Sequence, residues 1–516
     1  MNAVVSIAEM LALEEKAFAE GVDAWSLMQD AGRQMARAIR QRYPEPGVCR
    51  VFAGKGNNGG DAWVVAFGLQ QAGWDVDVKC PFSDPELSAL ARRAAAAWAQ
   101  RGNNLDRSAP PDGRRPLIVL DGLLGIGVKG EVRSPLREMI EEIGRLRADG
   151  AVVFSLDLPS GLGTGTCVVA DHTLAVGFAK EELLRDEATH FVGRISVLPL
   201  GELSCRWAEG ERRAQQSADL SQMCVSGEGQ RGTARPELAT AGSLRSLLPP
   251  RSFDVHKGQC GRVTIVAGSL GTTGAAVLAA MGALRGGAGL VSLFCPPEIH
   301  PILAPMLPPE VMARPWEHPA SIADENMDVL AIGPGLDPRW GDEIWSLIER
   351  VRVPLVLDAG ALTILARDVS RLRHIPVPVL LTPHPGEMER LFPQANRSRI
   401  RWAANFVATS ATKKTTLLLK GSRTLVAQAG FPMTFNPTGH PGMATGGMGD
   451  TLTGVCAALL AQKLSTRDAA RVGAWVCGRA AEIAIEDGTQ SQESLLPTDL
   501  ADQLGRAFAD LRAGVY

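Results

Sequence analysis

A single carboxylate stands in a glycine-rich stretch of the sequence. Asp450 is the only charged residue of positions 436–454, where six of nineteen residues are glycine. Gly446, Gly447 and Gly449 precede an apolar segment that predicts a helix. The first amides of a helix carry partial positive charge and lack internal partners, and phosphate oxygens can approach amides that no Cβ atom covers. This pattern predicts an anion hole for a phosphoryl group.

Asp450 would repel a bound phosphate, so the pattern implies a different use for this carboxylate. A carboxylate beside a phosphoryl group can take the proton from a hydroxyl that attacks phosphorus. We therefore predict that Asp450 is a general base, with a pKa that the helix N-terminus should lower. The alternative is a glycine turn in which Asp450 only caps the helix.

A second glycine loop, which is polar, follows an apolar segment near residue 50. Gly54, Gly56 and Gly59 satisfy the GxGxxG pattern, and aspartates follow about 20 residues further on, as in dinucleotide-binding turns. The letters NNGGD at 57–61 add two amides and a carboxylate, which are groups that can hydrogen-bond to a ligand. The loop therefore predicts a binding site for a dinucleotide.

The elements that must position these loops alternate along the first 200 residues. Apolar residues at three- and four-residue spacing predict helices within 6–21 and 24–43. Apolar segments that end in Gly, Asp or Pro predict strands of a parallel sheet covered on both faces. These segments are CRVFAG, DVDVKC, PLIVLDG, AVVFSLDL, HTLAVGF and GRISVLPLG.

A polar, Gly/Ser-rich segment follows, from Cys205 to about Ala241, and predicts a linker. A second α/β series comes after it, with the segments GRVTIVAGS, GLVSLFCP, MDVLAIGPG, VPLVLDAG, PVLLTPHPG and KTTLLLKG. Ligands bind beyond the carboxyl ends of the strands in such sheets, so two sheets predict two separate sites. We predict domains at 1–210 and 241–516, joined by a linker at 211–240.

Charge and composition argue against several classes of function. The 516 residues carry a formal net charge of −3 and 5% aromatic residues, which gives no support for nucleic acid or a membrane surface as partner. Nine cysteines without a CxxC pair predict reduced thiols in a cytoplasmic protein rather than a zinc site or a disulfide framework. The first residues lack the basic region of a secretory signal, and no run of 18 apolar residues appears.

The glycine-rich stretch around Asp450, MATGGMGDTLTGVCAALLAQ, resembles the GxGD signature of the ribokinase-like superfamily, and within it the branch that dehydrates hydrated NAD(P)H. Five further segments fit this branch in order, at 256–276, 332–338, 356–366, 381–391 and 418–427. The resemblance implies a dehydratase that uses ADP or ATP, with Mg2+, on the S epimer of hydrated NADH or NADPH. The hydroxyl of the hydrated ring is phosphorylated, and phosphate then leaves.

The same resemblance implies roles for single residues. Asp450 matches the catalytic base and Gly449 the amide of the anion hole. Ala275, Gly335 and His384 match the positions that hold the hydrated dinucleotide. The nucleotide-binding strand end is matched by Lys420, Gly421, Ser422, Arg423 and Thr424.

Segments of the first half resemble the NAD(P)H-hydrate epimerase family, at 21–36, 51–67, 121–136 and 155–163. This resemblance covers about residues 5–200 and implies interconversion of the R and S epimers. The ligand loops are matched by Asn57, Asn58, Gly59, Gly60 and Asp61, and by Gly125, Ile126, Gly127, Val128, Lys129, Gly130 and Glu131.

Three further roles follow from the epimerase resemblance. Asp157 matches an acid/base group, and Lys129 matches a lysine near the reacting ring. Asn58, Asp121 and Ser160 match a potassium site, whose oxygen-only ligands suit a hard cation rather than zinc. For Asp121 and Asp157, the alternative is helix capping after a strand.

The chain also departs from the usual residues of these families. The departures are Ala62 for glycine, Gly122 for alanine, Ile126 for threonine or serine, Asp337 for glycine, Gly360 for aspartate and Thr363 for asparagine. The sequence thus predicts an α/β chain with a Rossmann-like three-layer domain and a ribokinase-like domain, acting as a bifunctional repair enzyme and as a homo-oligomer. The alternatives are a small-molecule kinase of the sugar or hydroxymethylpyrimidine type, and a first domain that only binds dinucleotide. An NAD-dependent dehydrogenase is disfavoured because no residues for hydride transfer follow the glycine loop.

Overall fold

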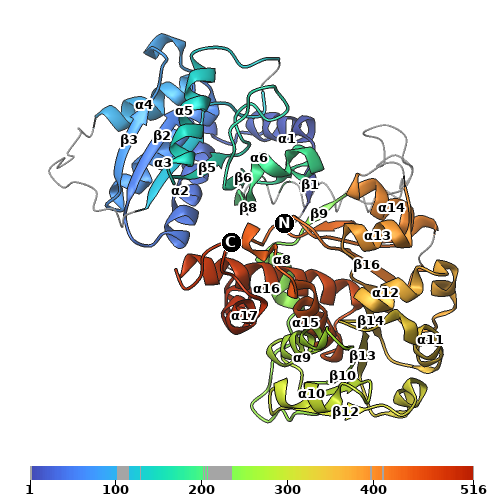
Figure 1. The fold of residues 1–516 in the computed structure, drawn as a ribbon. Helices are drawn as coiled ribbons and strands as arrows, with labels where there is room; N and C mark the ends of the chain where they lie inside the picture. Colours follow the sequence, from blue (N-terminus) through green and yellow to red (C-terminus); the bar gives the residue numbers. More distant parts are fainter. Residues whose placement is uncertain are drawn as a thin grey trace. The chain divides into compact units, whose positions relative to one another are not determined.

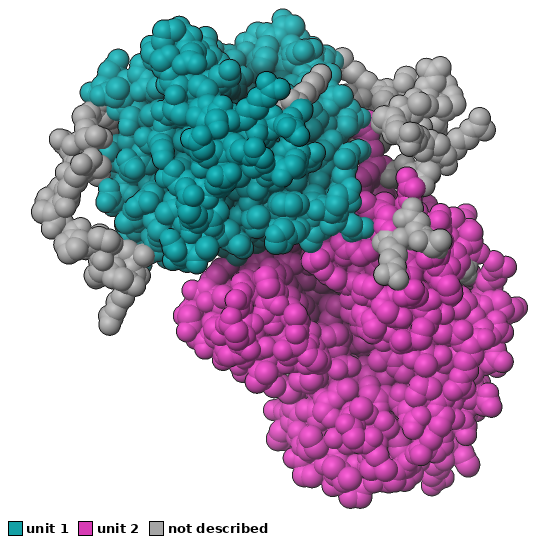
Figure 2. Space-filling model, turned by 45° about the horizontal axis from the view of Figure 1, so that its top comes forward, with its two compact units in different colours: residues 1–225, 516 teal, residues 226–515 magenta. Residues whose placement is uncertain are grey.

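The structure, a computed structural model, describes residues 3–100, 116–127, 130–201, 203, 206, 235–394, 398–409 and 412–514. The chain forms two compact units, one within residues 1–225 and one within residues 226–515, which Figure 2 colours separately. Val128, Lys129 and residues 211–234 of the expected linker lie outside the described residues. Within the described ranges, no helix is long and apolar enough to cross a membrane.

The first unit is built on a parallel six-stranded sheet with the order β3-β2-β4-β5-β6-β8 (Figure 1). Its strands are β2 Val48–Ala53, β3 Asp75–Lys79, β4 Leu117–Gly122, β5 Val152–Leu156, β6 His172–Val176 and β8 Arg194–Leu198. Its helices are α1 Ile7–Ala19, α2 Ala24–Arg42, α3 Asn57–Gln71, α4 Ala89–Ala99, α5 Leu136–Ala148 and α6 Thr189–Val192. A two-residue parallel pair, β1 Val4–Val5 with β7 Ala179–Lys180, lies beside this sheet.

Helices cover both faces of this sheet, as the apolar strand segments predict. Val51 and Phe52 are neighbours on β2, yet they belong to different cores because successive side chains of a strand point to opposite faces. The core around Val51 includes side chains of α2 and α3, and the core around Phe52 includes Ile140 of α5. Parallel sheets need such cover on both faces.

The second unit contains a ten-stranded sheet with the order β12-β11-β10-β13-β14-β15-β16-β17-β18-β9. Its strands are β9 Glu237–Leu238, β10 Arg262–Val266, β11 Leu290–Cys295, β12 Val311–Pro315, β13 Val329–Ile332, β14 Leu355–Leu357, β15 Val379–Leu381, β16 Thr415–Leu419, β17 Leu425–Gln428 and β18 Thr434–Phe435. Its helices are α8 Ala241–Leu244, α9 Thr273–Arg285, α10 His300–Leu303, α11 Gly341–Arg350, α12 Ala359–Leu365, α13 Pro385–Leu391, α14 Arg399–Thr409, α15 Met448–Ala461, α16 Thr466–Glu486 and α17 Pro497–Ala513.

Most strands of this second sheet are parallel to their neighbours, but β17 runs antiparallel to β16 and β18. Strand β9 pairs in parallel with β18 at the edge of the sheet. The sequence pattern places residues 237–238 in the linker, because a strand of two residues leaves no recognisable alternation.

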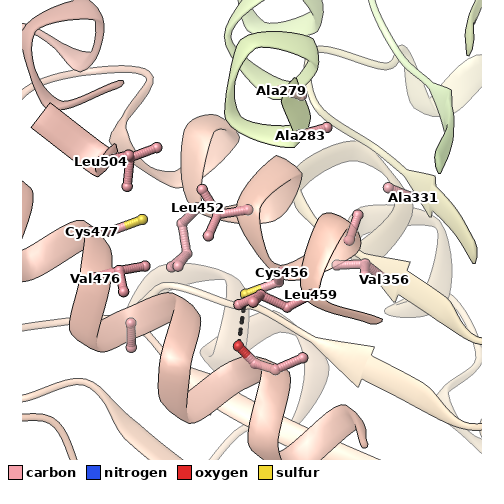
Figure 3. Packing of buried hydrophobic residues seen from close by; sticks show 14 of the residues in the cluster. Ala279, Ala283, Ala331, Val356, Leu452, Cys456, Leu459, Val476, Cys477 and Leu504 are labelled. Atoms are coloured by element: carbon pink, nitrogen blue, oxygen red, sulfur yellow. Dashed lines mark hydrogen bonds between the residues drawn. The ribbon is translucent and has the colours of Figure 1, made fainter. Parts of the chain in front are cut away.

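Helix α15 lies in the core of the second unit, and its packing fixes the position of the glycine-rich stretch. Figure 3 shows Leu452, Cys456 and Leu459 of α15 in one hydrophobic cluster with Ala279 and Ala283 of α9. The two backbones approach closely, since a Cβ atom at Gly454 would lie 2.0 Å from the carbonyl oxygen of Ala279. Glycine is therefore required at this crossing.

Two candidate active sites

The glycine-rich stretch forms the start of α15. Gly447 is the N-cap residue with a φ of 94°, a left-handed conformation that favours glycine, and Asp450 lies in the first turn of the helix. A Cβ atom at Gly449 would lie 3.0 Å from Nζ of Lys420. The stretch thus brings bare amides and an ammonium group together, as an anion hole requires, and places the Asp450 carboxylate beside them.

Lys420 connects this helix to the carboxyl ends of two other strands. It follows β16, and its Nζ donates to Oδ1 of Asp358 at 2.8 Å and lies 3.8 Å from Oε2 of Glu387. Asp358 follows β14 and is 1% exposed, and its Oδ2 accepts a hydrogen bond of 2.7 Å from Oγ1 of Thr453 on α15. This network fixes the ammonium group beside the first turn of α15.

Asp450 has a pKa that is raised to about 7. Burial is the largest cause, and the negative charge of Asp358 adds to it, while Lys420 acts in the opposite direction. The expectation that the helix N-terminus lowers this pKa is therefore wrong, because burial and a nearby carboxylate outweigh the helix dipole. A carboxylate with a pKa near 7 suits general-base catalysis at neutral pH.

Three residues expected to hold the dinucleotide lie at carboxyl ends of strands or on the helix beside them. Gly335 has a φ of 62°, and a Cβ atom there would lie 3.0 Å from Cβ of Ala275 on α9, so these two residues are neighbours. His384 caps α13, where its Nδ1 accepts hydrogen bonds from the amides of Gly386 and Glu387. Nε2 of His384, on a side chain that is 53% exposed, takes no part in this cap and lies 3.6 Å from Oε2 of Glu387.

Residues 420–424, expected to bind the nucleotide, form the turn between β16 and β17. Gly421 has a φ of 150° and Arg423 a φ of 57°, and Oγ1 of Thr424 donates to the carbonyl oxygen of Gly421 at 3.1 Å. A Cβ atom at Gly421 would lie 2.7 Å from a guanidinium nitrogen of Arg399, so a bulkier residue would displace this arginine from the turn.

The first unit contains a cavity of about 620 Å³. It borders the loops after β2 and β4, where the strand order reverses, and this is the position at which doubly wound sheets bind ligands. Predicted site residues that line the cavity are Asn57, Asn58, Asp61, Gly125, Ile126, Gly127, Glu131 and Asp157. Gly59 and Gly60 lie outside this lining, because Gly59 packs on the backbone of Gly54 and Gly60 packs on Met28.

Asp157 has an unusual backbone conformation at the end of β5, with a φ of 66°. Its Oδ1 accepts hydrogen bonds from the amide of Val176, at 3.1 Å, and from Nζ of Lys180. Lys180 is fully buried and also donates to the carbonyl oxygen of Val176 at 3.0 Å. The sequence does not reveal this lysine as a site residue, because it lies 23 positions after Asp157 in a segment without a motif.

The three residues expected to bind potassium meet around the loop after β4. Ser160 donates through Oγ to Oδ1 of Asp121, and Nδ2 of Asn58 donates to the carbonyl oxygen of Leu124 at 2.9 Å. Oδ1 of Asn58 is buried and has no hydrogen-bond partner in the described part of the chain. Burial also raises the pKa of Asp121, whose hydrogen-bond partners within the described residues are all neutral.

Comparison with known proteins covers both units. A family model described as NAD(P)H-hydrate dehydratase matches residues 263–506, and one described as the N-terminus of YjeF-related proteins matches residues 24–182. The bifunctional NAD(P)H-hydrate repair enzyme of Moorella thermoacetica is 33% identical over 99% of this chain and 98% of its own length. The chain belongs to this family of bifunctional repair enzymes.

A second relative agrees with this assignment. The bifunctional repair enzyme of Escherichia coli is 33% identical over 94% of this chain and 90% of its own length. The crystal structure of the ADP/ATP-dependent NAD(P)H-hydrate dehydratase of Bacillus subtilis, co-crystallised with ATP and Mg2+, is 31% identical. It covers 54% of this chain and 98% of its own, with a TM-score of 0.46. The predicted α/β fold class, with a Rossmann-like and a ribokinase-like unit, is confirmed.

Two residues that the sequence leads us to expect as departures from the family pattern, Ala62 and Gly122, are in contact. A Cβ atom at Gly122 on β4 would lie 2.5 Å from Cβ of Ala62 on α3. One methyl group fills the space between this helix and this strand. The alanine at 62 and the glycine at 122 are therefore matched in size.

Gly122→Ala is expected to destabilise the first unit by about 1–3 kcal/mol, because it places a second methyl group in a filled space. The double variant Ala62→Gly with Gly122→Ala should recover part of this loss, although glycine within a helix itself costs about 1 kcal/mol. Urea denaturation of the two single variants and the double variant gives the coupling free energy. Additive effects of the two changes would contradict the compensation.

Proposed function

We propose that the second unit dehydrates the S epimer of hydrated NADH or NADPH with ADP or ATP, and that the first unit interconverts the R and S epimers. The observation that carries the proposal is the carboxylate of Asp450, with its pKa raised to about 7, in a glycine loop beside Lys420. Membership in the bifunctional repair family supports both activities.

In the second unit, the bare amides before and within the first turn of α15 receive the transferred phosphoryl group. Lys420 offsets its negative charge, and residues 420–424 hold the nucleotide. Asp450 takes the proton of the substrate hydroxyl as its oxygen attacks phosphorus. The carbon–oxygen bond then breaks, phosphate leaves with the bonding electrons, and loss of a ring proton restores the double bond. Ala275, Gly335 and His384 hold the dinucleotide in this scheme.

The dehydratase reaction takes Mg2+ together with the nucleotide. Within the described residues, no group of three or more His, Cys, Asp or Glu side chains is arranged to hold a metal ion. We expect the phosphates of the nucleotide to hold this ion, as is common for Mg2+. Bound in this way, the ion neutralises charge on the phosphoryl group.

In the first unit, Asp157 moves protons at the reacting ring, and the loops at 57–61 and 125–131 hold the rest of the substrate. The lysine expected near the ring, Lys129, lies outside the described residues and remains a prediction. The unpartnered Oδ1 of Asn58 and the buried carboxylate of Asp121 fit an oxygen-only site for potassium. Such an ion would stabilise the loop that carries Leu124.

Potassium is expected to stimulate epimerisation more than sodium does, and Ser160→Ala should remove the difference between the two salts. Ser155→Ala is the matched control, because Ser155 also donates to Asp121 but is not among the proposed ligands. The measurement is the initial rate of epimerisation in KCl and in NaCl at equal ionic strength. Equal rates of the wild type in both salts would overturn the potassium site.

The end products distinguish a dehydratase from the small-molecule kinase considered above. We expect a hydrolysed nucleotide, inorganic phosphate and restored NADH, because the elimination releases the phosphoryl group. Phosphorus NMR of the completed reaction follows each of these species. A stable phosphorylated dinucleotide as the final product would favour the kinase.

We also infer a cytoplasmic, homo-oligomeric enzyme with small-molecule partners only. The described cysteines support a reducing compartment, because all of them are free thiols: Cys49, Cys80, Cys167, Cys260, Cys295, Cys456 and Cys477.

A further inference from the structure

The epimerase cavity contains more carboxylates than the sequence motifs indicate. Glu14, on α1, lines the cavity together with Asp61, Asp157 and Lys180. The pKa of Glu14 and the pKa of Asp61 are both raised, chiefly by burial and then by the charge of Asp157. Three acidic side chains therefore line the same cavity as the buried ammonium group of Lys180.

The ammonium group of Lys180 is paired with Asp157, which is one of these three acids. Its Nζ donates to Oδ1 of Asp157 and to the carbonyl oxygen of Val176. The side chain of Lys180 is 1% exposed, and a buried ammonium group is tolerated only when it is paired. The ammonium group of Lys180 bonds directly to Asp157. Its charge lowers the pKa of Glu14 and of Asp61, but this is the smallest of the influences on either group.

The fold places this pair at the carboxyl edge of the sheet. Asp157 follows β5 and Lys180 lies on β7, shortly after the neighbouring strand β6. The amide of Asp157 donates to the carbonyl oxygen of Leu174 on β6, and β7 is held in parallel register by β1. The relative position of the two side chains is therefore fixed by backbone pairing.

We propose that Lys180 is a positioning residue of the epimerase site, which fixes the Asp157 carboxylate in the cavity wall through a buried ion pair. This inference rests on the proposed function of the first unit. Lys180 acts through Asp157, so its removal should slow turnover without weakening substrate binding.

The test follows epimerisation of purified R epimer by chiral chromatography, with nucleotide omitted so that the dehydratase is silent. Lys180→Met is expected to lower kcat about 100-fold with KM within about threefold of the wild type. The double variant Lys180→Met with Asp157→Asn should be no slower than Asp157→Asn alone, because residues that act as one unit are not additive. Lys79→Met is the matched control, since it removes an exposed lysine paired with Glu142 outside the cavity.

The results separate the inference from the function on which it rests. Dehydration of S epimer by the second unit of the same chain reports the concentration of active protein in each variant. An unchanged kcat for Lys180→Met, or a double variant slowed by the product of the two single effects, would overturn the role of Lys180. Wild-type epimerisation by Asp157→Asn would instead overturn the proposed role of Asp157.

Rescue provides a second test that does not depend on the methionine variant. Lys180→Ala leaves space for a small cation, so ethylammonium should restore part of kcat, whereas tetramethylammonium, which has no N–H donor, should not. A Lys180→Ala chain that binds hydrated NADPH with the wild-type Kd but gains no rate from ethylammonium would contradict the inference.

Discussion

Asp450→Asn is expected to abolish the nucleotide-dependent recovery of NADH from its S hydrate, with a loss of about 10²–10⁴-fold in kcat. The variant keeps the size of the side chain but cannot accept a proton from the substrate hydroxyl. Recovery of absorbance at the NADH band, after addition of ADP or ATP to purified S epimer, measures the effect. Dehydration at the wild-type rate would mean that Asp450 only caps α15.

Two controls accompany this variant. Epimerisation should be unchanged, since Asp450 and the epimerase cavity belong to different units. For the wild type, kcat/KM should fall as the pH drops below about 7, because Asp450 is then protonated and has lost its function as a base. A flat profile between pH 5 and pH 8 would contradict the proton transfer to Asp450.

Asp157→Asn is expected to slow epimerisation by about 10²–10⁴-fold and to leave the binding of hydrated NADPH largely intact. Asparagine is chosen because it tolerates the left-handed conformation of this position, whereas alanine would add backbone strain. The rate is followed from purified R epimer by chiral chromatography, and binding by calorimetry.

The outcome for Asp157→Asn distinguishes catalysis from docking. A first unit that only binds dinucleotide would show no epimerisation even as the wild type. A variant that exchanges epimers at the wild-type rate would remove Asp157 from the mechanism. Loss of binding together with loss of rate would mean that this carboxylate holds the substrate and does not react with it.

The sequence predicts the loops that carry the chemistry but not the partners of their charged groups. Asp450 is recognisable because the glycines that define its environment are its neighbours in sequence. Lys420 and Asp358 are 62 positions apart, and Lys180 and Asp157 are 23 apart, so their pairing depends on which strands lie side by side. Strand order is a property of the fold and leaves no local pattern.

The pKa of Asp450 illustrates a second limit. The helix N-terminus is visible in the sequence, and its dipole alone favours a lower pKa. The raised pKa follows from burial and from the Asp358 carboxylate, which reaches the site from β14. Similarly, Ala62 and Gly122 read as two unrelated departures until the contact between α3 and β4 joins them.

The most direct test of the two-unit account starts from purified R epimer with nucleotide and Mg2+. The wild type should convert all of it to NADH, because the first unit supplies the S epimer that the second unit consumes. Asp157→Asn should recover NADH only at the rate of spontaneous epimerisation, and Asp450→Asn should produce a mixture of epimers without NADH. Recovery of NADH from R epimer by Asp157→Asn at the wild-type rate would contradict the account.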